Sequence, residues 1–467
     1  MNGPGAADVA VIGAGVVGTA IARALACQDV SCVLIDAAGD VGTGTTKANT
    51  AILHTGFDTV PGTLESRLLR RGSALLAGYA RRAGIPVERT GALLVAWTAE
   101  QLAELPAVRD KAHRNGCTDV RPVAVADLYR REPHLGPGAL GALEIPGEAI
   151  ICPWTTPLAY ATQALAAGAR LRLRSRVTAI QAGRTGHQVV TSTGVVRCRW
   201  VVNAAGLYSD AIDAMMGGDR FTIRPRRGEL IVFDKLARPL LRSILLPVPT
   251  ARTKGVLVAP TVYGNVLLGP TAEDVGDRGD TATTRAGLDA LLGAGHRILP
   301  GLAAAEVTAC YAGLRAATQD RDYQIWADPD RRYACAGGIR STGLSASLGI
   351  AEYVTGLLAG AGLRLAGRPE PDPPVMPYIG QAGIRPYQDA ARIAADPEYG
   401  RIVCHCERVT RGEIRDALAG PLPPTDLDGL RRRTRVLNGR CQGFYCAAAV
   451  SALFAAAGQP PGPEPAA

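Results

Sequence analysis

Three glycines near the N-terminus have the spacing of a turn that binds a dinucleotide. Gly13, Gly15 and Gly18 form the pattern G-x-G-x-x-G directly after the apolar run 9–12. In such a turn the first glycine allows the tight bend, the second lets the backbone approach a pyrophosphate, and the third lets the next helix pack closely. Asp36 ends the following apolar run at the spacing of a carboxylate that binds a ribose diol. The pattern predicts a site for the phosphates and ribose of a dinucleotide.

Three later segments have the composition of loops that approach a ligand closely. Residues 42–47 (GTGTTK) combine glycines with hydroxyl side chains, which suits a pyrophosphate too long for one helix to hold. Residues 199–206 form an apolar strand that ends in small residues, and residues 335–345 form a glycine-rich loop that opens a helical run. The start of that helix can stabilise negative charge on a reduced ring system. These loops favour FAD over NAD as the dinucleotide.

Four of the 11 cysteines form a metal-binding pattern. Cys404 and Cys406 give C-x-C, and Cys441 and Cys446 give C-x4-C further along the chain. Four thiolates can hold a 2Fe–2S cluster or a zinc ion, but zinc ribbons more often use C-x2-C. Arginines 431–433, 435 and 440 can offset the charge of an anionic cluster. The spacing favours the 2Fe–2S cluster, with zinc as the alternative.

Composition limits the class of protein that positions these residues. A chain of 467 residues with 55 Gly and only 5% aromatic residues fits an α/β fold of two or three domains. The net charge is +9, but only four basic residues are Lys and the Arg are spread among acids. We therefore expect no nucleic-acid binding, and an anionic cofactor and substrate explain part of the charge excess.

No apolar run of about 20 residues and no clear signal peptide is visible, so we expect a cytoplasmic protein. Any contact with a membrane is expected to be peripheral, at the inner membrane face.

Together the motifs resemble the D-amino-acid-oxidase/glycerol-3-phosphate-dehydrogenase superfamily of flavoproteins, over residues 8 to about 365. The resemblance implies a Rossmann-like FAD domain at residues 6–90, 150–220 and 310–365. It also implies an inserted substrate domain with an antiparallel sheet, the cap, at residues 91–149 and 221–309. The FAD contacts that it implies are Gly13, Gly15, Val16, Val17, Gly18, Asp36, Thr45, Thr46, Lys47, Asn49, Val177, Ala205, Gly206, Gly313, Gly338, Arg340, Ser341, Thr342, Gly343 and Leu344.

Residues 47–63 (KANTAILHTGFDTVPGT) are similar to a stretch of L-2-hydroxyglutarate oxidases that contains a histidine followed by Ser/Thr-Gly. Oxidation of a secondary alcohol needs a base for the hydroxyl proton, and His54 suits that work. The alternative is a histidine that only hydrogen-bonds the flavin or the backbone. For an anionic substrate, Arg315 and Arg340 are the first candidate cations, and Lys254 and Arg227 the second.

The sequence departs from one relative in a way that bears on the substrate. Glycerol-3-phosphate dehydrogenases generally carry an Arg a few residues after the histidine-glycine motif, whereas this chain has Phe57 and Asp58 there. The difference favours a small carboxylate over a phosphate without excluding the phosphate.

The C-terminal cysteine spacing resembles the 2Fe–2S domain of bacterioferritin-associated ferredoxin. We expect a linker at residues 366–403, a small helical 2Fe–2S domain at 404–450 and a disordered tail at 458–467. The cofactors are then FAD and a 2Fe–2S cluster. The expected function is a dehydrogenase of a small anionic hydroxy compound, L-2-hydroxyglutarate-like or glycerol 3-phosphate. Its electrons leave through the cluster to an acceptor or a partner flavoprotein or iron–sulfur subunit. The alternatives are an amine or amino-acid dehydrogenase subunit and a non-catalytic electron-transfer subunit.

Overall fold

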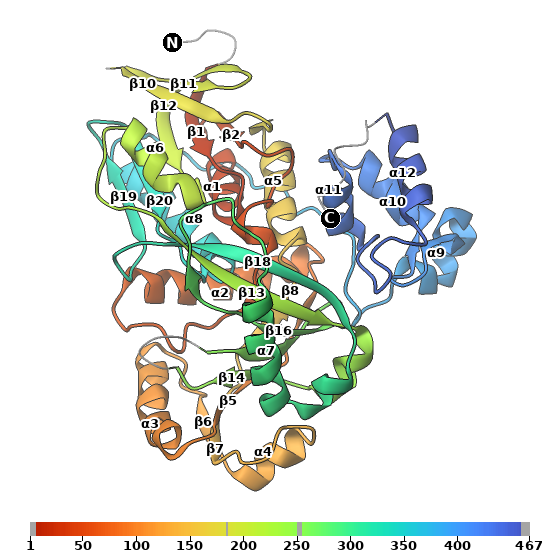
Figure 1. Cartoon of the computed structure of the whole chain (residues 1–467). Helices are drawn as coiled ribbons and strands as arrows, with labels where there is room; N and C mark the ends of the chain where they lie inside the picture. The colour runs from red at the N-terminus through yellow and green to blue at the C-terminus, as the bar shows by residue number, and fades with distance from the viewer. Residues whose placement is uncertain (1–5, 184, 250–254, 459–467) are drawn as a thin grey trace.

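Two large β-sheets and a helical C-terminal domain make up the protein, whose computed structural model describes residues 6–183, 185–249 and 255–458. Figure 1 shows the first sheet at the top of the molecule, the second sheet below it and the C-terminal domain to one side. The tail predicted from residue 458 lies outside the described residues except for Gly458.

The first sheet has a parallel centre built on the strand that precedes the glycine turn. Its order is β9–β2–β1–β12–β20, all parallel, with β19 antiparallel at the end and the β10–β11 hairpin on the first half of β12. Both faces of β1 are covered, which explains its continuous apolar sequence. The strands are β1 (Ala7–Ile12), β2 (Cys32–Ile35), β9 (Arg170–Arg172), β10 (Val177–Gly183), β11 (Gly186–Thr191), β12 (Gly194–Asn203), β19 (Gln324–Asp328) and β20 (Tyr333–Gly337).

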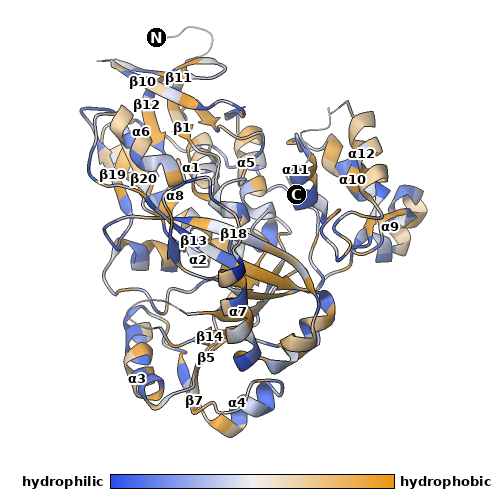
Figure 2. Ribbon diagram, viewed as in Figure 1, coloured by the Kyte–Doolittle hydropathy of each residue, from blue (hydrophilic) through white to orange (hydrophobic). Residues whose placement is uncertain are grey.

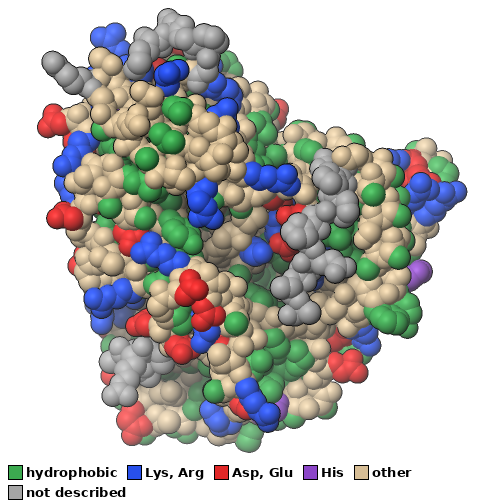
Figure 3. Space-filling model, turned by 45° about the horizontal axis from the view of Figure 1, so that its top comes forward, with side chains coloured by type: hydrophobic (Ala, Val, Ile, Leu, Met, Phe, Trp, Pro, Cys, Tyr) green, Lys and Arg blue, Asp and Glu red, His purple; other side chains and the backbone are tan. Residues whose placement is uncertain are grey.

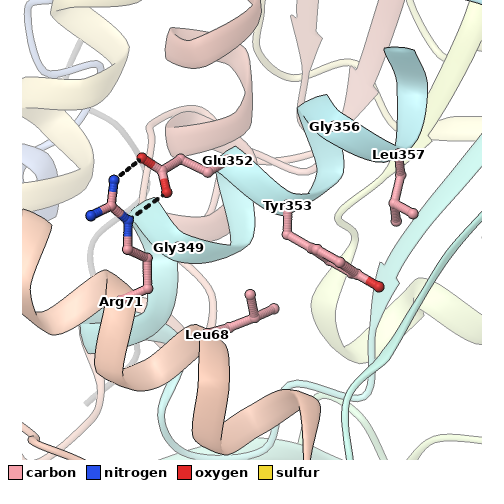
Figure 4. Close-up of a pocket in the computed structure, with 7 residues that line it drawn as sticks. All are labelled: Leu68, Arg71, Gly349, Glu352, Tyr353, Gly356 and Leu357. Atoms are coloured by element: carbon pink, nitrogen blue, oxygen red, sulfur yellow. Dashed lines mark hydrogen bonds and ion pairs between the residues drawn. The ribbon is translucent and has the colours of Figure 1, made fainter. Parts of the chain in front are cut away.

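Helices cover both faces of this sheet. On the face that carries Val9 and Val11 lie α1 (Val16–Ala26), α5 (Thr155–Ala166) and α8 (Gly343–Gly360), and α6 (Ser209–Met215) lies on the opposite face. The helix α2 (Leu64–Arg82) crosses α8 so closely that a Cβ at Gly349 would overlap the carbonyl oxygen of Leu68. At this crossing Arg71 forms a bidentate ion pair with Glu352, 2.8 Å for each bond, and both residues line a small surface pocket (Figure 4).

The second sheet, the cap sheet, combines strands from both predicted cap segments. Its order is β17–β13–β16–β15–β14–β5–β7–β6, with β18 on the other edge of β13. All pairs are antiparallel except β14 with β5, where the two segments of the chain meet. Its strands are β5 (Ala92–Ala96), β6 (Arg121–Val123), β7 (Gly141–Ile145), β13 (Arg224–Phe233), β14 (Ile244–Pro247), β15 (Leu257–Pro260), β16 (Val266–Gly269), β17 (Glu273–Asp274) and β18 (Val307–Ala317).

One domain boundary differs from the prediction. The boundary expected at residue 310 falls inside β18, which pairs with β13 along its whole length. Backbone pairing with a neighbouring strand therefore places β18 in the cap sheet and not in the dinucleotide domain. The cap helices are α3 (Ala99–Arg114), α4 (Val125–Arg131) and α7 (Arg285–Ile298). A third, small sheet has the strand order β3 (Ile52–Leu53), β8 (Ala149–Ile151), β4 (Val87–Glu88).

The C-terminal domain begins earlier than predicted. It comprises α9 (Ala390–Ala395), a hairpin of β21 (Ile402–Cys404) and β22 (Val409–Thr410), α10 (Arg411–Ala419), α11 (Leu427–Thr434) and α12 (Ala447–Ala456). The predicted linker, residues 366–403, is only partly a linker. Met376 packs on the dinucleotide domain and its N–H bonds to the Ala83 carbonyl at 2.8 Å, whereas the fully buried Arg385 pairs with Glu413 of α10 at 3.0 Å.

Apolar sequence concentrates in the two sheets. Figure 2 shows orange strands at the centre of the molecule and blue turns on the outer helices α3 and α9. Within the described part of the chain, no helix is both long and apolar enough to cross a membrane.

Candidate active site

A cavity of about 930 Å³ lies between the first sheet and the cap sheet. Its size is at the upper end of the range for small-molecule and cofactor sites. Most of the predicted site residues line it: Gly13, Gly15, Val16, Val17, Asp36, Thr45, Thr46, Asn49, His54, Val177, Ala205, Gly206, Gly313, Arg315, Arg340, Ser341, Thr342, Gly343 and Leu344. The topology thus gathers residues that are more than 300 positions apart in the sequence into one site.

The three glycines of the turn differ in what a side chain at each position would contact. A Cβ at Gly18 would overlap the carbonyl oxygen of Gly13, and a Cβ at Gly13 would overlap that of Ala204. Packing therefore requires both of these glycines. At Gly15 a Cβ would meet only the hydroxyl of Thr46, at 3.3 Å, and the φ of −68° suits any residue. Nothing within the protein requires Gly15, so the open space beside it fits a ligand that approaches the backbone.

Hydrogen bonds hold the dinucleotide end of the cavity in place. The Asp36 carboxylate accepts the N–H of Ala14 at 2.6 Å and that of Ala38 at 2.7 Å. Burial raises the pKa of Asp36 although these bonds oppose it. The N–H of Val16, at the start of α1, donates to the Thr46 hydroxyl at 3.1 Å. Each carboxylate oxygen retains a second lone pair, so Asp36 can still accept a bond from a ribose hydroxyl.

The loop after Asp36 is fixed to the floor of the cavity. Thr45 donates to the carbonyl of Leu314 at 2.7 Å. The side chain of Asn49 donates to the Thr46 carbonyl at 2.6 Å and accepts the N–H of Ala51 at 2.7 Å. Asn49 therefore shapes the loop, and Gly313 lets β18 approach it, because a Cβ there would overlap the Ala48 carbonyl.

Three predicted contacts do not line the cavity. Gly18 lies behind the turn, where it serves helix packing. Gly338 has a φ of +62° and sits against Gln324, which explains the glycine by conformation and not by a ligand. Lys47 was expected at the cofactor, but its ammonium pairs with Asp428 of the C-terminal domain at 3.1 Å. We correct the Lys47 prediction: the side chain reaches the neighbouring domain because the loop passes between that domain and the cavity.

His54 lies between two carboxylates. Its Nδ1 is 2.8 Å from Glu148 and its Nε2 is 3.0 Å from Asp58. Burial alone would lower the pKa of His54, but the charges and hydrogen bonds of Glu148 and Asp58 outweigh it and raise the pKa to about 10. A pKa in this range favours the imidazolium at neutral pH, a form that must lose a proton before it can accept one. The role of His54 as the base therefore stays a prediction.

Arginines gather on the cap side of the cavity. Arg226 of β13 and Arg315 of β18 face each other in register, and Arg321 and Arg340 line the same space. Arg226 pairs with Asp274 at 2.6 Å. Within the described residues, no carboxylate forms an ion pair with Arg315 or Arg340, and burial together with the charges of Arg226 and Arg340 lowers the pKa of Arg315 to about 10. Cations without an ion-pair partner in a cavity, as Arg315 and Arg340 are in the described residues, are suited to an anionic ligand.

The second-rank cations do not join this group. Arg227 points away from the cavity and pairs with Glu273 at 2.6 Å and Asp280 at 2.9 Å. Lys254 lies outside the described residues.

Sequence reasoning missed four residues of the reacting end: Asp58, Glu148, Arg226 and Arg321. Asp58 carried a usable signal, because a carboxylate four residues after a histidine can reach its ring. Glu148 carried none, since it lies 94 positions from His54 and is joined to it only by the pairing of β8 with β3.

The four cysteines of the C-terminal domain meet in two pairs. The thiols of Cys406 and Cys441 are within hydrogen-bonding reach of each other, as are those of Cys404 and Cys446. Backbone N–H groups of residues 443–445 also point at the Cys441 sulfur. No three His, Cys, Asp or Glu side chains in the described ranges converge on a single metal-ion position. Two pairs of thiols fit the two irons of a 2Fe–2S cluster better than one tetrahedral zinc.

Buried charges join the C-terminal domain to the dinucleotide domain. Asp40, only 1% exposed, accepts bonds from Arg432 at 2.8 Å and from Arg433 at 2.6 and 2.8 Å. Burial alone would raise the pKa of Asp40, but the bonds and charges of these arginines lower it below its usual value. The C-terminal domain is therefore attached next to the loop that lines the cavity.

Comparisons with known proteins agree with this geometry. Residues 8–357 match the family described as FAD dependent oxidoreductase, and residues 402–456 match the BFD-like 2Fe-2S binding domain. A glycerol 3-phosphate dehydrogenase of Caloramator mitchellensis is 32% identical over 449 residues, which cover 96% of this chain and 94% of that protein. An L-2-hydroxyglutarate dehydrogenase of Bos taurus is 29% identical over 57% of this chain and 60% of its own length.

Among solved structures, the FAD-bound L-alpha-glycerophosphate oxidase of Mycoplasma pneumoniae superposes with a TM-score of 0.74 at 26% identity. It covers 79% of this chain and 98% of its own. The predicted fold class and the predicted cofactors, FAD and a 2Fe–2S cluster, are confirmed. The chain belongs to the FAD dependent oxidoreductase family and carries a BFD-like 2Fe-2S domain at its C-terminus.

Proposed function

We propose that the chain is a dehydrogenase of a small anionic hydroxy compound, with glycerol 3-phosphate as the first candidate. The observation that carries the proposal is the arginine group in the cavity, where Arg315 and Arg340 have no ion-pair partner in the described residues. The relative that matches nearly the whole chain, including the C-terminal domain, is named a glycerol 3-phosphate dehydrogenase.

The absence of an arginine after the histidine-glycine motif does not argue against a phosphate. Asp58 occupies that position and bonds to His54, while arginines from β13, β18 and the 335–345 loop supply positive charge instead. A planar guanidinium fork can bind either phosphate or carboxylate oxygens through two parallel hydrogen bonds. L-2-Hydroxyglutarate is therefore the second candidate substrate.

When bound, the flavin supplies the acceptor for the hydride that leaves the substrate carbon. The arginines bind and orient the substrate anion. Because the imidazolium form of His54 is favoured at neutral pH, we assign the hydroxyl proton to the carboxylate of Asp58, which His54 holds in position. His54 is itself anchored by Glu148 at Nδ1 and by its backbone N–H, which donates to the Ser345 hydroxyl at 2.8 Å.

The substrate is tested by anaerobic addition of glycerol 3-phosphate, L-2-hydroxyglutarate and a panel of amino acids to the purified holoenzyme. Bleaching of the flavin by a hydroxy compound and not by amino acids is expected. Bleaching by an amino acid alone would support an amine dehydrogenase, and no bleaching by any compound would support a non-catalytic electron-transfer subunit.

Electron exit through the cluster to a one-electron acceptor or a partner subunit is the remaining part of the proposal. Replacing Cys404 and Cys406 with Ser should remove the cluster signal and leave flavin bleaching by substrate intact. Turnover with the physiological acceptor should fall sharply, while a dye that takes electrons directly from flavin should still be reduced. Normal turnover with that acceptor in the double variant would make the domain structural and not a route for electrons.

A further inference from the structure

Two aromatic rings lie between the wall of the cavity and the C-terminal domain. Trp154, which precedes α5, stacks on Tyr263, in the turn between β15 and β16, with ring centroids 4.9 Å apart and planes inclined by 19°. Tyr263 is 5% exposed, and its hydroxyl lies 3.0 Å from the Cys152 sulfur. Neither ring lines the cavity, so neither is explained by ligand binding.

On the cavity side, one backbone segment separates these rings from the ligand space. The indole N–H of Trp154 donates to the carbonyl of Lys47 at 3.2 Å. The next two residues, Ala48 and Asn49, line the cavity. A third ring, the half-buried Tyr311 of β18, donates its hydroxyl to the carbonyl of Asn49 at 2.9 Å. Trp154 and Tyr311 are therefore hydrogen-bonded to the backbone of residues 47–49, the segment that borders the cavity.

On the other side, the rings meet a cation that is linked to the cysteines. The guanidinium of Arg435 lies 4.2 Å from the centre of the Tyr263 ring and 5.6 Å from that of Trp154. Its Nε donates at 3.1 Å to Glu407, the residue after Cys406. Two residues beyond Arg435, the backbone N–H of Leu437 points at the sulfur of Cys446. Arg435 therefore contacts the rings, bonds to the residue that follows Cys406, and lies two residues before the N–H that points at Cys446.

Burial of Arg435 needs an explanation, because a desolvated cation is costly unless it is fully paired. It is 5% exposed and is held by Glu407 and by the side-chain oxygen of Asn265 at 3.2 Å. Lys235 pairs with the same Glu407 at 2.9 Å. This network fixes the guanidinium over the ring face, the geometry of a cation–π contact.

We propose that Trp154, Tyr263 and Arg435 form the route along which single electrons pass from reduced flavin to the 2Fe–2S cluster. The route rests on the proposed function in one respect, namely that the cluster receives the electrons of the flavin. Hydride transfer brings two electrons to the flavin; each then reduces the cluster by one electron, and the flavin releases its proton to water as it is oxidised. A one-electron acceptor outside the chain reoxidises the cluster after each step. Stacked π systems and short hydrogen bonds couple donor and acceptor better than aliphatic side chains or empty space.

The test compares Trp154→Leu and Tyr263→Leu with a matched control, Trp326→Leu. Trp326 of β19 also packs against an aromatic ring, Phe221, and an arginine, Arg220, but it lies away from the C-terminal domain and does not line the cavity. The flavin of the holoenzyme is reduced with light in the absence of substrate, and the absorbance of flavin and cluster is followed. We expect cluster reduction to lag several-fold in the two interface variants and to match the native protein in the control.

Two further measurements distinguish electron transfer through the rings from a loss of packing against the C-terminal domain, and from a failure of the proposed function. Tyr263→Phe keeps a ring in place and should reduce the cluster at the native rate. Trp154→Phe keeps a ring but loses the N–H bond to the Lys47 carbonyl, so its rate should fall between those of the native protein and the Leu variant. Direct chemical reduction of the cluster should proceed at the native rate in every variant. A native rate in both Leu variants, or an equal loss in the Phe and Leu variants, would overturn the route. If the cluster of the native protein never accepts electrons from its photoreduced flavin, the proposed electron exit fails as well.

Discussion

The two ends of the cavity are built by different means. At the dinucleotide end, backbone N–H groups, glycines and one carboxylate form the surface, and Asp36 and Thr46 are already hydrogen-bonded within the protein. At the reacting end, charged side chains dominate, and Arg315 and Arg340 are without an ion-pair partner in the described residues. The first end is complete in itself, whereas the second needs an anion to balance its charge.

The difference follows from how each end is encoded. A glycine turn, a helix start and the next strand are consecutive in the chain, so one short sequence determines their geometry. The arginine group instead depends on the register of β13 against β18, which brings Arg226 opposite Arg315. A short motif therefore predicts the first end, and only the sheet topology predicts the second.

The largest effect is expected from Gly15→Val, compared with Gly18→Val. At residue 15 an added Cβ meets only the Thr46 hydroxyl, so we expect the valine protein to fold but to lack FAD, because the side chain extends into the space for the pyrophosphate. Valine at residue 18 overlaps the backbone of Gly13 and should prevent folding. Circular dichroism of the purified proteins measures their folding, with native protein stripped of FAD as the reference, and their flavin content measures FAD binding. A Gly15→Val protein that retains full FAD would show that this end is not built for a ligand.

Arg315→Ala and Arg340→Ala test the reacting end. Loss of either cation should cost about 2–5 kcal/mol of transition-state binding in kcat/KM, as when a buried charge pair is truncated. Flavin content should not change. Replacing either arginine with Lys should restore little of the lost kcat/KM where the anion is held by two parallel bonds. The control is Arg224→Ala, an exposed arginine of β13, the strand that pairs with β18. If both variants stay within a few-fold of the control, the substrate anion is bound elsewhere.

The charge state of His54 gives a smaller effect, on stability. Because folding raises the pKa of His54 from 6.5 to about 10, protonation stabilises the folded state. This contribution is full below about pH 6.5, declines above it and is lost once the pH exceeds about 10. Thermal unfolding of native protein and His54→Gln across this range should therefore converge at high pH. Parallel curves would mean that the ring is neutral in the folded protein.

Thr46→Ala should have the smallest effect. It removes the acceptor for the N–H of Val16 but leaves the glycine turn unchanged. A single hydrogen bond of this kind contributes about 0.5–1.5 kcal/mol, so FAD affinity and thermal stability should fall slightly. Complete loss of FAD would mean that Thr46 contacts the cofactor as well as the turn.

Sequence reasoning identified the fold class and both cofactors, and most of the site residues that it predicted line the cavity. Its failures have physical causes. The turn, the acid and the cysteine pairs are local patterns, so their spacing is informative. Lys47 failed because its partner, Asp428, is 381 positions away on another domain. His54 lines the cavity, but its charge depends on Glu148, which only tertiary structure brings within reach. The predicted linker failed because proline content does not reveal that a nearby arginine, Arg385, is buried.

The contact of Asp40 with Arg432 and Arg433 has a consequence for how the protein is made. The carboxylate and its partners are 392 and 393 positions apart, so a ribosome exposes Asp40 long before it synthesises either arginine. At roughly 5–20 residues per second, this interval is about 20–80 s. During that time the loop beside the glycine turn has an acid that must stay hydrated, because no cation is available to bury it. The nascent protein therefore cannot complete its N-terminal domain in order of synthesis, and that domain reaches its final form only after the last helices emerge.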